Sequence, residues 1–89
     1  KWSLWIRKAQ VDKIELSFDA EDQAMAENAF SKDTEGLIIP LTSVHEKSLI
    51  PLGHNSIIRK NDKIGCLVNN QKMDLFNAWL QQSPFSISQ

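Results

Sequence analysis

The polar cluster His54-Asn55-Ser56, followed closely by Arg59, holds the side chains of this chain that are best suited to bind a small ligand. Imidazole, amide, hydroxyl and guanidinium groups can all hydrogen-bond an anion or a nucleotide base. The cluster comes directly after Pro51-Leu52-Gly53, where we expect a loop between two strands. The same residue types are also common in turns that bind nothing. A ligand site and an ordinary polar turn are therefore both compatible with this segment.

Thiol catalysis and soft-metal binding would have to use Cys66, His45 and His54. Cys66 lies in an apolar segment, where cysteine behaves as a small buried hydrophobic residue. The spacing of the three residues matches no zinc-binding pattern. With a single cysteine, the chain cannot form an internal disulfide, which fits a reducing compartment.

The carboxylates and glycines also predict no active site. The acidic residues early in the chain fit the start and the solvated face of a helix: Asp19, Glu21, Asp22 and Glu27. A phosphate-binding loop needs closely spaced glycines, whereas the three glycines here are far apart. We therefore expect a protein that is not an enzyme and holds no metal.

Composition indicates one globular domain. The chain has 89 residues, of which 42% are hydrophobic and 24% are charged. The net charge of −1, with both signs well mixed, argues against nucleic-acid binding. No apolar run reaches the roughly 18 residues of a membrane span, and no signal peptide is visible. The start at Lys1 rather than Met suggests a piece of a longer protein.

The apolar pattern predicts a small α+β domain, with a mostly antiparallel sheet of about four to five short strands flanked by helices. Pro40 predicts that its strand is either an edge or bulged. Asp19 is expected to cap the first helix of the domain, and Asn69 or Asn70 the last one. The expected strands are Val11–Phe18, Leu37–Val44, Ser48–Pro51, Ser56–Arg59 and Lys63–Val68; the expected helices are Ala20–Phe30 and Gln71–Gln82.

Residues 1–10 form a separate amphipathic helix or linker in this interpretation. Trp2, Trp5, Ile6 and Ala9 fall on one side at helical spacing. This side could pack on the domain or on a second copy, or it could lie at a membrane interface beside the basic residues. Residues 11–82 make the domain itself, and residues 83–89 are expected to be a flexible tail.

The middle of the chain resembles the RCK C-terminal (TrkA-C) domain family. The resemblance spans roughly Ile14 to Leu80, and its distinctive part is Ile50–Ile64: a proline, a polar turn, a strand, an Asn-Asp turn and the last strand. Asn61 stands where the family has a turn glycine. Asparagine tolerates the left-handed conformation that such a turn requires.

The resemblance implies a regulatory module on the cytoplasmic side of a membrane, not a catalyst. Such domains pair as homodimers and are attached to, or assemble with, potassium channels, potassium uptake systems and cation/proton antiporters. Some members bind a small nucleotide effector such as cyclic di-AMP at the dimer interface. Pro51, His54 and Asn55 match the family's proline and turn positions. With Arg59 from the polar cluster, they are the candidate ligand-binding residues: Pro51, His54, Asn55 and Arg59.

A second interpretation remains open from the sequence. The chain could be an unrelated protein–protein interaction or assembly domain, which docks through an edge strand near Pro40 or through the N-terminal tryptophan helix.

Overall fold

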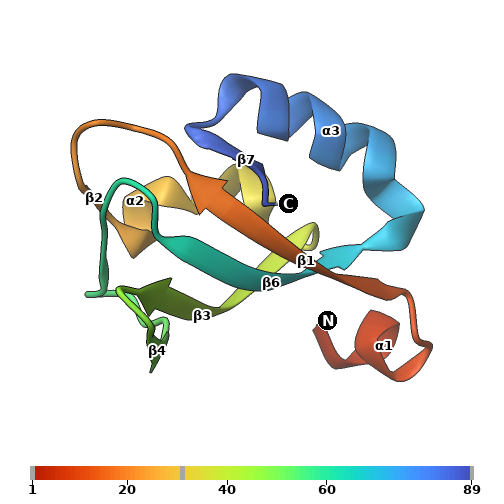
Figure 1. The fold of residues 1–89 in the computed structure, drawn as a ribbon. Coiled ribbons are helices and arrows are strands. Elements are labelled where there is room, and N and C mark those ends of the chain that lie inside the picture. Colours follow the sequence, from red (N-terminus) through yellow and green to blue (C-terminus); the bar gives the residue numbers. More distant parts are fainter. Residues whose placement is uncertain (1, 31, 89) are drawn as a thin grey trace.

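The computed structural model describes residues 2–30 and 32–88 and shows two antiparallel sheets with short helices (Figure 1). The main sheet has five strands in the order β4-β3-β6-β1-β7, and β2 and β5 form a separate pair. The strands are β1 Val11–Phe18, β2 Ala24–Met25, β3 Ile38–His45, β4 Ser48–Pro51, β5 Ile57–Ile58, β6 Lys63–Asn69 and β7 Phe85–Ile87. The helices are α1 Trp2–Arg7, α2 Ala26–Ala29 and α3 Met73–Gln82, with 3-10 turns at Lys32–Thr34 and Asn70–Lys72. The predicted α+β class is confirmed.

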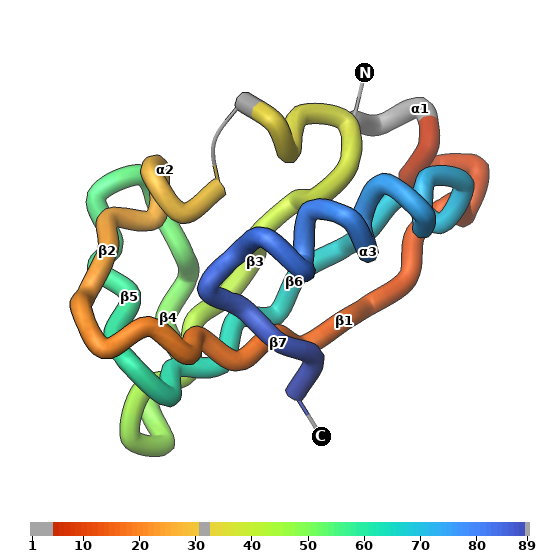
Figure 2. Tube along the Cα trace, turned by 90° about the horizontal axis from the view of Figure 1, so that it is seen from above, coloured from red at the N-terminus to blue at the C-terminus, as the bar shows by residue number. Residues whose placement is uncertain are grey.

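The hydrophobic core lies on one face of the main sheet, under α2 and α3 (Figure 2). Alternate residues of β1 and β6 point into it, because successive side chains of a strand face opposite sides. The two strands pair in register, with Leu16 opposite Ile64 and Ile14 opposite Cys66. The buried core residues are Leu16, Phe18, Ala26, Leu37, Ile38, Ile58, Ile64, Cys66, Val68, Phe76 and Phe85.

Strand β3 is bulged at Pro40, as one of the two predicted alternatives required. Its register against β6 shifts between Pro40 and Thr42, so that Leu41 is the extra residue. The bulge accommodates a residue that has no backbone N–H to donate. β3 is not an edge strand, because it lies between β4 and β6. The edges of the sheet are β4 and β7.

The predicted helix over Ala20–Phe30 is wrong in length. Only α2, four residues long, is helical, and the two residues before it pair with β5. Asp19 does not cap this helix; its backbone N–H donates to the Pro84 carbonyl over 2.7 Å instead. The Ala26 N–H likewise donates to the Ser56 carbonyl over 2.8 Å. Strand-type hydrogen bonds to distant segments replace the first turns of the expected helix.

The expected flexible tail over 83–89 is also corrected, since Phe85–Ile87 forms β7 on the outer side of β1. Phe85 is only 4% exposed, and its ring centroid lies 5.2 Å from that of Phe18. A large aromatic side chain that fits into the core fixes this end of the chain.

The two remaining helices are α3, which follows a capped turn, and α1, which packs on the domain through Trp5. The Asn69 side chain accepts a hydrogen bond from Gln71 N and caps the 3-10 turn Asn70–Lys72 that leads into α3. The predicted cap therefore forms on this turn, whereas α3 itself begins at Met73 without a side-chain cap. Helix α1 lies on the side of the sheet opposite α3 (Figure 1), and its Trp5 is 9% exposed while Ile6 remains exposed. Trp5 therefore packs on its own domain, as one alternative predicted. The prediction for the Trp2 side chain falls outside the part that the structure describes.

Candidate ligand site

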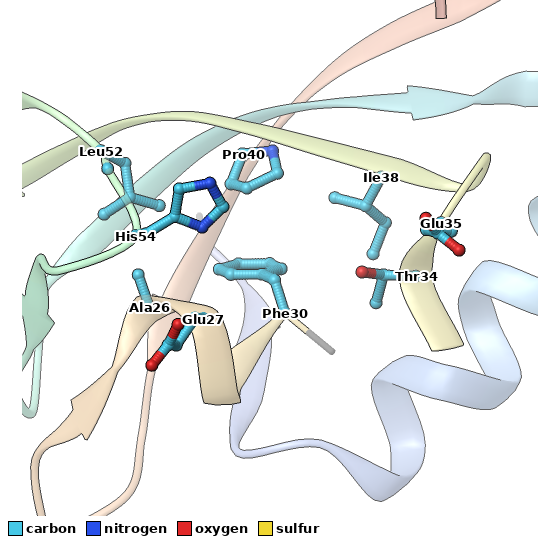
Figure 3. A pocket seen from close by; sticks show the side chains of 10 residues that line it. Ala26, Glu27, Phe30, Thr34, Glu35, Ile38, Pro40, Leu52 and His54 are labelled. Atoms are coloured by element: carbon cyan, nitrogen blue, oxygen red, sulfur yellow. The ribbon is translucent and has the colours of Figure 1, made fainter. Parts of the chain in front are cut away.

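A pocket of about 380 Å³ lies between α2 with the following 3-10 turn on one side and β3 with the loop after β4 on the other (Figure 3). We call it the Phe30 pocket. Its described lining consists of Ala26, Glu27, Phe30, Thr34, Glu35, Ile38, Pro40, Leu52, Gly53 and His54. The volume is within the range of small-molecule sites, about 300–1,000 Å³.

Backbone hydrogen bonds hold the loop that closes the pocket. Leu52 N donates to the carbonyl of the bulged residue Leu41 over 2.9 Å, which continues the β3–β4 pairing into the loop. Gly53 N donates to Ser56 Oγ over 2.9 Å, and Ser56 N donates to the Gly53 carbonyl over 3.1 Å. These bonds form a tight turn, which places His54 in the lining of the pocket, above the Phe30 ring in Figure 3.

Most of the pocket surface is apolar. In Figure 3 the Phe30 ring lies beneath His54 and Pro40, and Ile38 and Leu52 extend the same upper wall on either side. Two carboxylates, Glu27 and Glu35, complete the described lining together with the buried Thr34. No described lining residue is a lysine or an arginine.

Of the four predicted ligand-binding residues, His54 alone lines this pocket. Pro51 ends β4 and is exposed, Asn55 is exposed in the turn, and Arg59 is exposed just after β5. The structure places all four along the continuous segment 51–59. It does not bring them together in either of the two described cavities.

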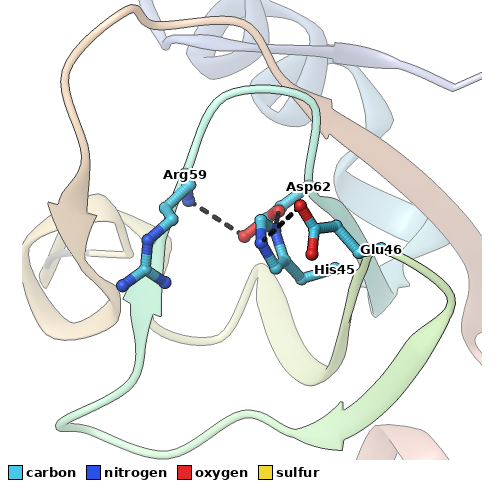
Figure 4. Close-up of polar contacts among 4 residues, drawn as sticks. All are labelled: His45, Glu46, Arg59 and Asp62. Carbon is cyan, nitrogen blue, oxygen red and sulfur yellow. Dashed lines mark hydrogen bonds and ion pairs between the residues drawn. The ribbon is translucent and has the colours of Figure 1, made fainter.

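A cluster around Asp62 was not predicted from the sequence. Asp62 is 2% exposed, and its two carboxylate oxygens accept hydrogen bonds from His45 Nδ1 and, over 2.9 Å, from Arg59 N (Figure 4). The Asn-Asp turn was expected, and Asn61 indeed has a φ of +73°. The turn pattern could not indicate that the Asp62 side chain would point inward to meet a histidine 17 residues earlier.

The turn around Asp62 also joins three strands. Phe18 N donates to the Asp62 carbonyl over 3.0 Å, and Asn61 N donates to the Phe18 carbonyl over 2.8 Å. His45 lies at the end of β3, and Asp62 directly precedes β6. The cluster therefore fixes the ends of β1, β3 and β6 to one another.

Cys66 is a buried core residue, as expected. Its thiol donates a hydrogen bond to the Ile14 carbonyl over 3.4 Å. Burial raises the pKa of the Cys66 thiol from 9.0 to about 12, because a thiolate would lose its hydration there. The thiol is therefore a poor nucleophile in the folded protein. Within residues 2–30 and 32–88, no group of three or more His, Cys, Asp or Glu side chains could hold a metal ion.

A second pocket, of about 320 Å³, lies beside α3. It is lined by Asp33, Glu35, Leu37, Lys72, Leu75, Ala78, Trp79 and Gln82. Glu35 borders both pockets, and the Phe30 and Trp79 rings stack with centroids 6.0 Å apart. The charges of this lining are mixed, since Lys72 faces the same space as the carboxylates.

Strand β4 presents an apolar outer edge next to the Phe30 pocket. All four of its residues are exposed, including Leu49 at 69% and Ile50 at 49%. Because β4 is outermost, one row of its backbone N–H and C=O groups has no strand partner among the described residues. Such an edge can pair with a strand of another chain.

Comparisons of the chain with protein-family models, with curated proteins and with solved structures find no match. No helix in the described part of the chain is both long and apolar enough to cross a membrane.

Proposed function

We propose that this domain is a non-catalytic module that senses a small ligand, dimerises, and thereby regulates a monovalent cation transporter or channel on the cytoplasmic side of the membrane. One observation carries the proposal. The segment with the distinctive resemblance, Ile50–Ile64, contributes both to the exposed edge strand and to the loop that closes the Phe30 pocket. An interface element and a ligand-binding loop are thus consecutive in the chain.

The exposed edge supports the dimer. Leu49 and Ile50 offer apolar surface, and the backbone of β4 offers hydrogen bonds to an antiparallel copy of itself. Two copies related by a two-fold axis would extend the five-stranded sheets into one.

The mechanism follows from linkage between binding and dimer arrangement. Leu52–His54 follow β4 directly, and Leu52 is hydrogen-bonded to Leu41. A ligand that contacts this loop can favour one position of β4 over another. Binding of the ligand then shifts the equilibrium between two arrangements of the dimer, and with it the state of the attached transporter. The size of the shift is set by the difference between the ligand's affinities for the two arrangements.

Sedimentation velocity over a range of concentrations tests the dimer. We expect a reversible dimer that Ile50→Lys weakens, because a charge on an edge strand opposes strand pairing. Ile87→Lys is the matched control, since Ile87 is an exposed apolar residue on the opposite edge strand, β7. A monomer at all concentrations, or equal effects of the two substitutions, would contradict the proposal.

The effector is tested separately by thermal unfolding in the presence of cyclic di-AMP. The exposed guanidinium of Arg59 is the group of this segment that suits a phosphate, and His54 and Asn55 could hydrogen-bond a base. We expect cyclic di-AMP to raise the unfolding temperature, and we expect Arg59→Gln to reduce the increase. No stabilisation by cyclic di-AMP would remove the nucleotide from the proposal but not the dimer.

A second candidate function is an assembly domain unrelated to transport, which docks on a larger protein. The same free β4 edge favours it, together with the exposed Ile6 of α1. Deletion of residues 1–10 distinguishes the two surfaces. If the deletion abolishes binding to the parent protein or to liposomes but leaves self-association unchanged, α1 is the docking element.

A further inference from the structure

The carboxylates in the described lining of the Phe30 pocket suit a cation rather than a nucleotide. Its described lining contains two carboxylates, Glu27 and Glu35, and no lysine or arginine. Neither carboxylate forms an ion pair with a described residue; the described ion pairs are His45–Glu46, His45–Asp62 and Lys60–Glu21. Among the described lining residues an anion would meet two carboxylates and no lysine or arginine, whereas a cation would find two partners.

The two carboxylates do not converge on one point. Figure 3 shows Glu27 and Glu35 toward opposite ends of the lining, with Phe30, Pro40 and His54 between them. A compact metal ion needs several oxygen ligands around a single centre. The Phe30 pocket instead presents a mostly apolar middle section, which includes the His54 ring, with a carboxylate toward each end.

We propose that the Phe30 pocket binds a linear aliphatic diamine or polyamine. An ammonium group at each end of such a molecule would pair with Glu27 and Glu35. The methylene groups between them would lie on the Phe30 ring and on the aliphatic side chains of Ile38 and Leu52. A polyamine is the class of small molecule that has this order of charged, apolar and charged parts.

This inference goes beyond the proposed function, because it holds whichever protein carries the domain. It also assigns a different place to each ligand class. The polyamine occupies the pocket between α2 and β3, whereas the nucleotide proposed above would use the exposed turn with Arg59. His54 borders both places, so the two ligands are expected to influence each other's binding.

Spermidine titrated into the intact domain, followed by NMR spectroscopy, tests the proposal. We expect saturable shifts of the Ala26 and Leu52 methyl signals. We also expect nuclear Overhauser contacts between spermidine methylenes and the Phe30 ring. n-Butylamine, with one charge, should bind more weakly than putrescine, which has the same four-carbon chain and two charges.

Charge-removing variants show whether the carboxylates hold the ligand. Both are exposed, and an exposed ion pair contributes little, so Glu27→Gln and Glu35→Gln should each raise the Kd about 1.5- to 5-fold. The double variant should show about the product of the two effects. Glu15→Gln is the matched control, because Glu15 is an exposed glutamate on β1 that does not line the pocket.

Three results would overturn the proposal. The first is no saturable shift at millimolar spermidine. The second is a Kd that changes as much in Glu15→Gln as in the pocket variants, which would indicate a general effect of net charge. The third is saturable binding whose shifts and contacts map away from the Phe30 pocket. Thermal unfolding of each variant verifies that all of them are folded.

Discussion

Replacement of Asp62 by alanine should destabilise the domain more than any other single loss of a carboxylate. Asp62 is 2% exposed, and it accepts hydrogen bonds from His45 Nδ1 and Arg59 N. A hydrogen bond to a charged group contributes about 1.5–3 kcal/mol. His45 is 36% exposed, so water can replace part of its lost bond. We therefore expect Asp62→Ala to cost about 3–4 kcal/mol.

This cost is large for a domain of this size. A stability of about 0.05–0.15 kcal/mol per residue corresponds to about 4–13 kcal/mol for the whole chain. Urea unfolding followed by tryptophan fluorescence measures the change. The control is Asp22→Ala, because Asp22 is exposed in the segment before β2 and should lose less than about 0.5 kcal/mol.

A double-mutant cycle with His45→Ala then isolates the pair. Removal of His45 alone leaves a buried carboxylate with one fewer partner, so the two substitutions should not add. We expect a coupling free energy of about 1–3 kcal/mol between His45 and Asp62. A loss below about 1 kcal/mol for Asp62→Ala, or a coupling near zero, would refute the view that this cluster holds the strand ends together.

Three further predictions concern the backbone and the core. Gly65→Ala should cost about 1–3 kcal/mol, because an added Cβ would lie 2.8 Å from Thr42 Oγ1, and the loss should shrink in a Thr42→Ala background. Ala9→Gly should stabilise the domain by up to about 1 kcal/mol, since Ala9 has a φ of +55° in the turn that follows α1; an unchanged urea midpoint would contradict this. Burial raises the pKa of the Cys66 thiol from 9.0 to about 12 in the folded protein. At a pH between these two values the unfolded state loses the thiol proton and the folded state keeps it, so the free energy of unfolding falls as pH rises. Between pH 7 and pH 10 the free energy of unfolding should therefore fall by about 1 kcal/mol more than that of a Cys66→Val variant measured at both pH values.

The long strands could be predicted because their signal is local. Ile14, Leu16 and Phe18 alternate with polar residues, and this pattern alone determines which side of β1 is buried. The cap at Asn69 was predictable for the same reason, since a cap depends on residues two or three positions away.

The errors arose where distant segments compete with local preference. The Ala24–Met25 pair would fit a helix, but its partners Ile57 and Ile58 lie more than 30 residues later in the chain. Phe85 likewise packs against Phe18, which lies far from it in the sequence. No local pattern reports such pairings, and so the length of α2 and the existence of β7 were not predicted.

The candidate site was predictable only in part, for a related reason. The polar turn with His54 was visible in the sequence, because turn residues cluster locally. The Phe30 pocket was not, since its two walls come from residues 26–35 and from residues 38–54. The carboxylates Glu27 and Glu35 became candidates for binding only when the fold placed them around the same space as His54.

The extra residue in β3 has a consequence for how the strand can change during evolution. Successive residues of a regular strand face opposite sides, so Pro40 and Ser43, three positions apart, would face opposite sides of an unbulged strand. Both lie on the core side here, since Pro40 pairs with Cys66 and Ser43 with Ile64. The bulge takes Leu41 out of the alternation, and His45, two residues after Ser43, therefore reaches Asp62. A deletion of Leu41 would leave the same pairs in a regular ladder and keep His45 beside Asp62, whereas a regularly paired insertion between Leu41 and His45 would turn His45 to the other side without altering either residue.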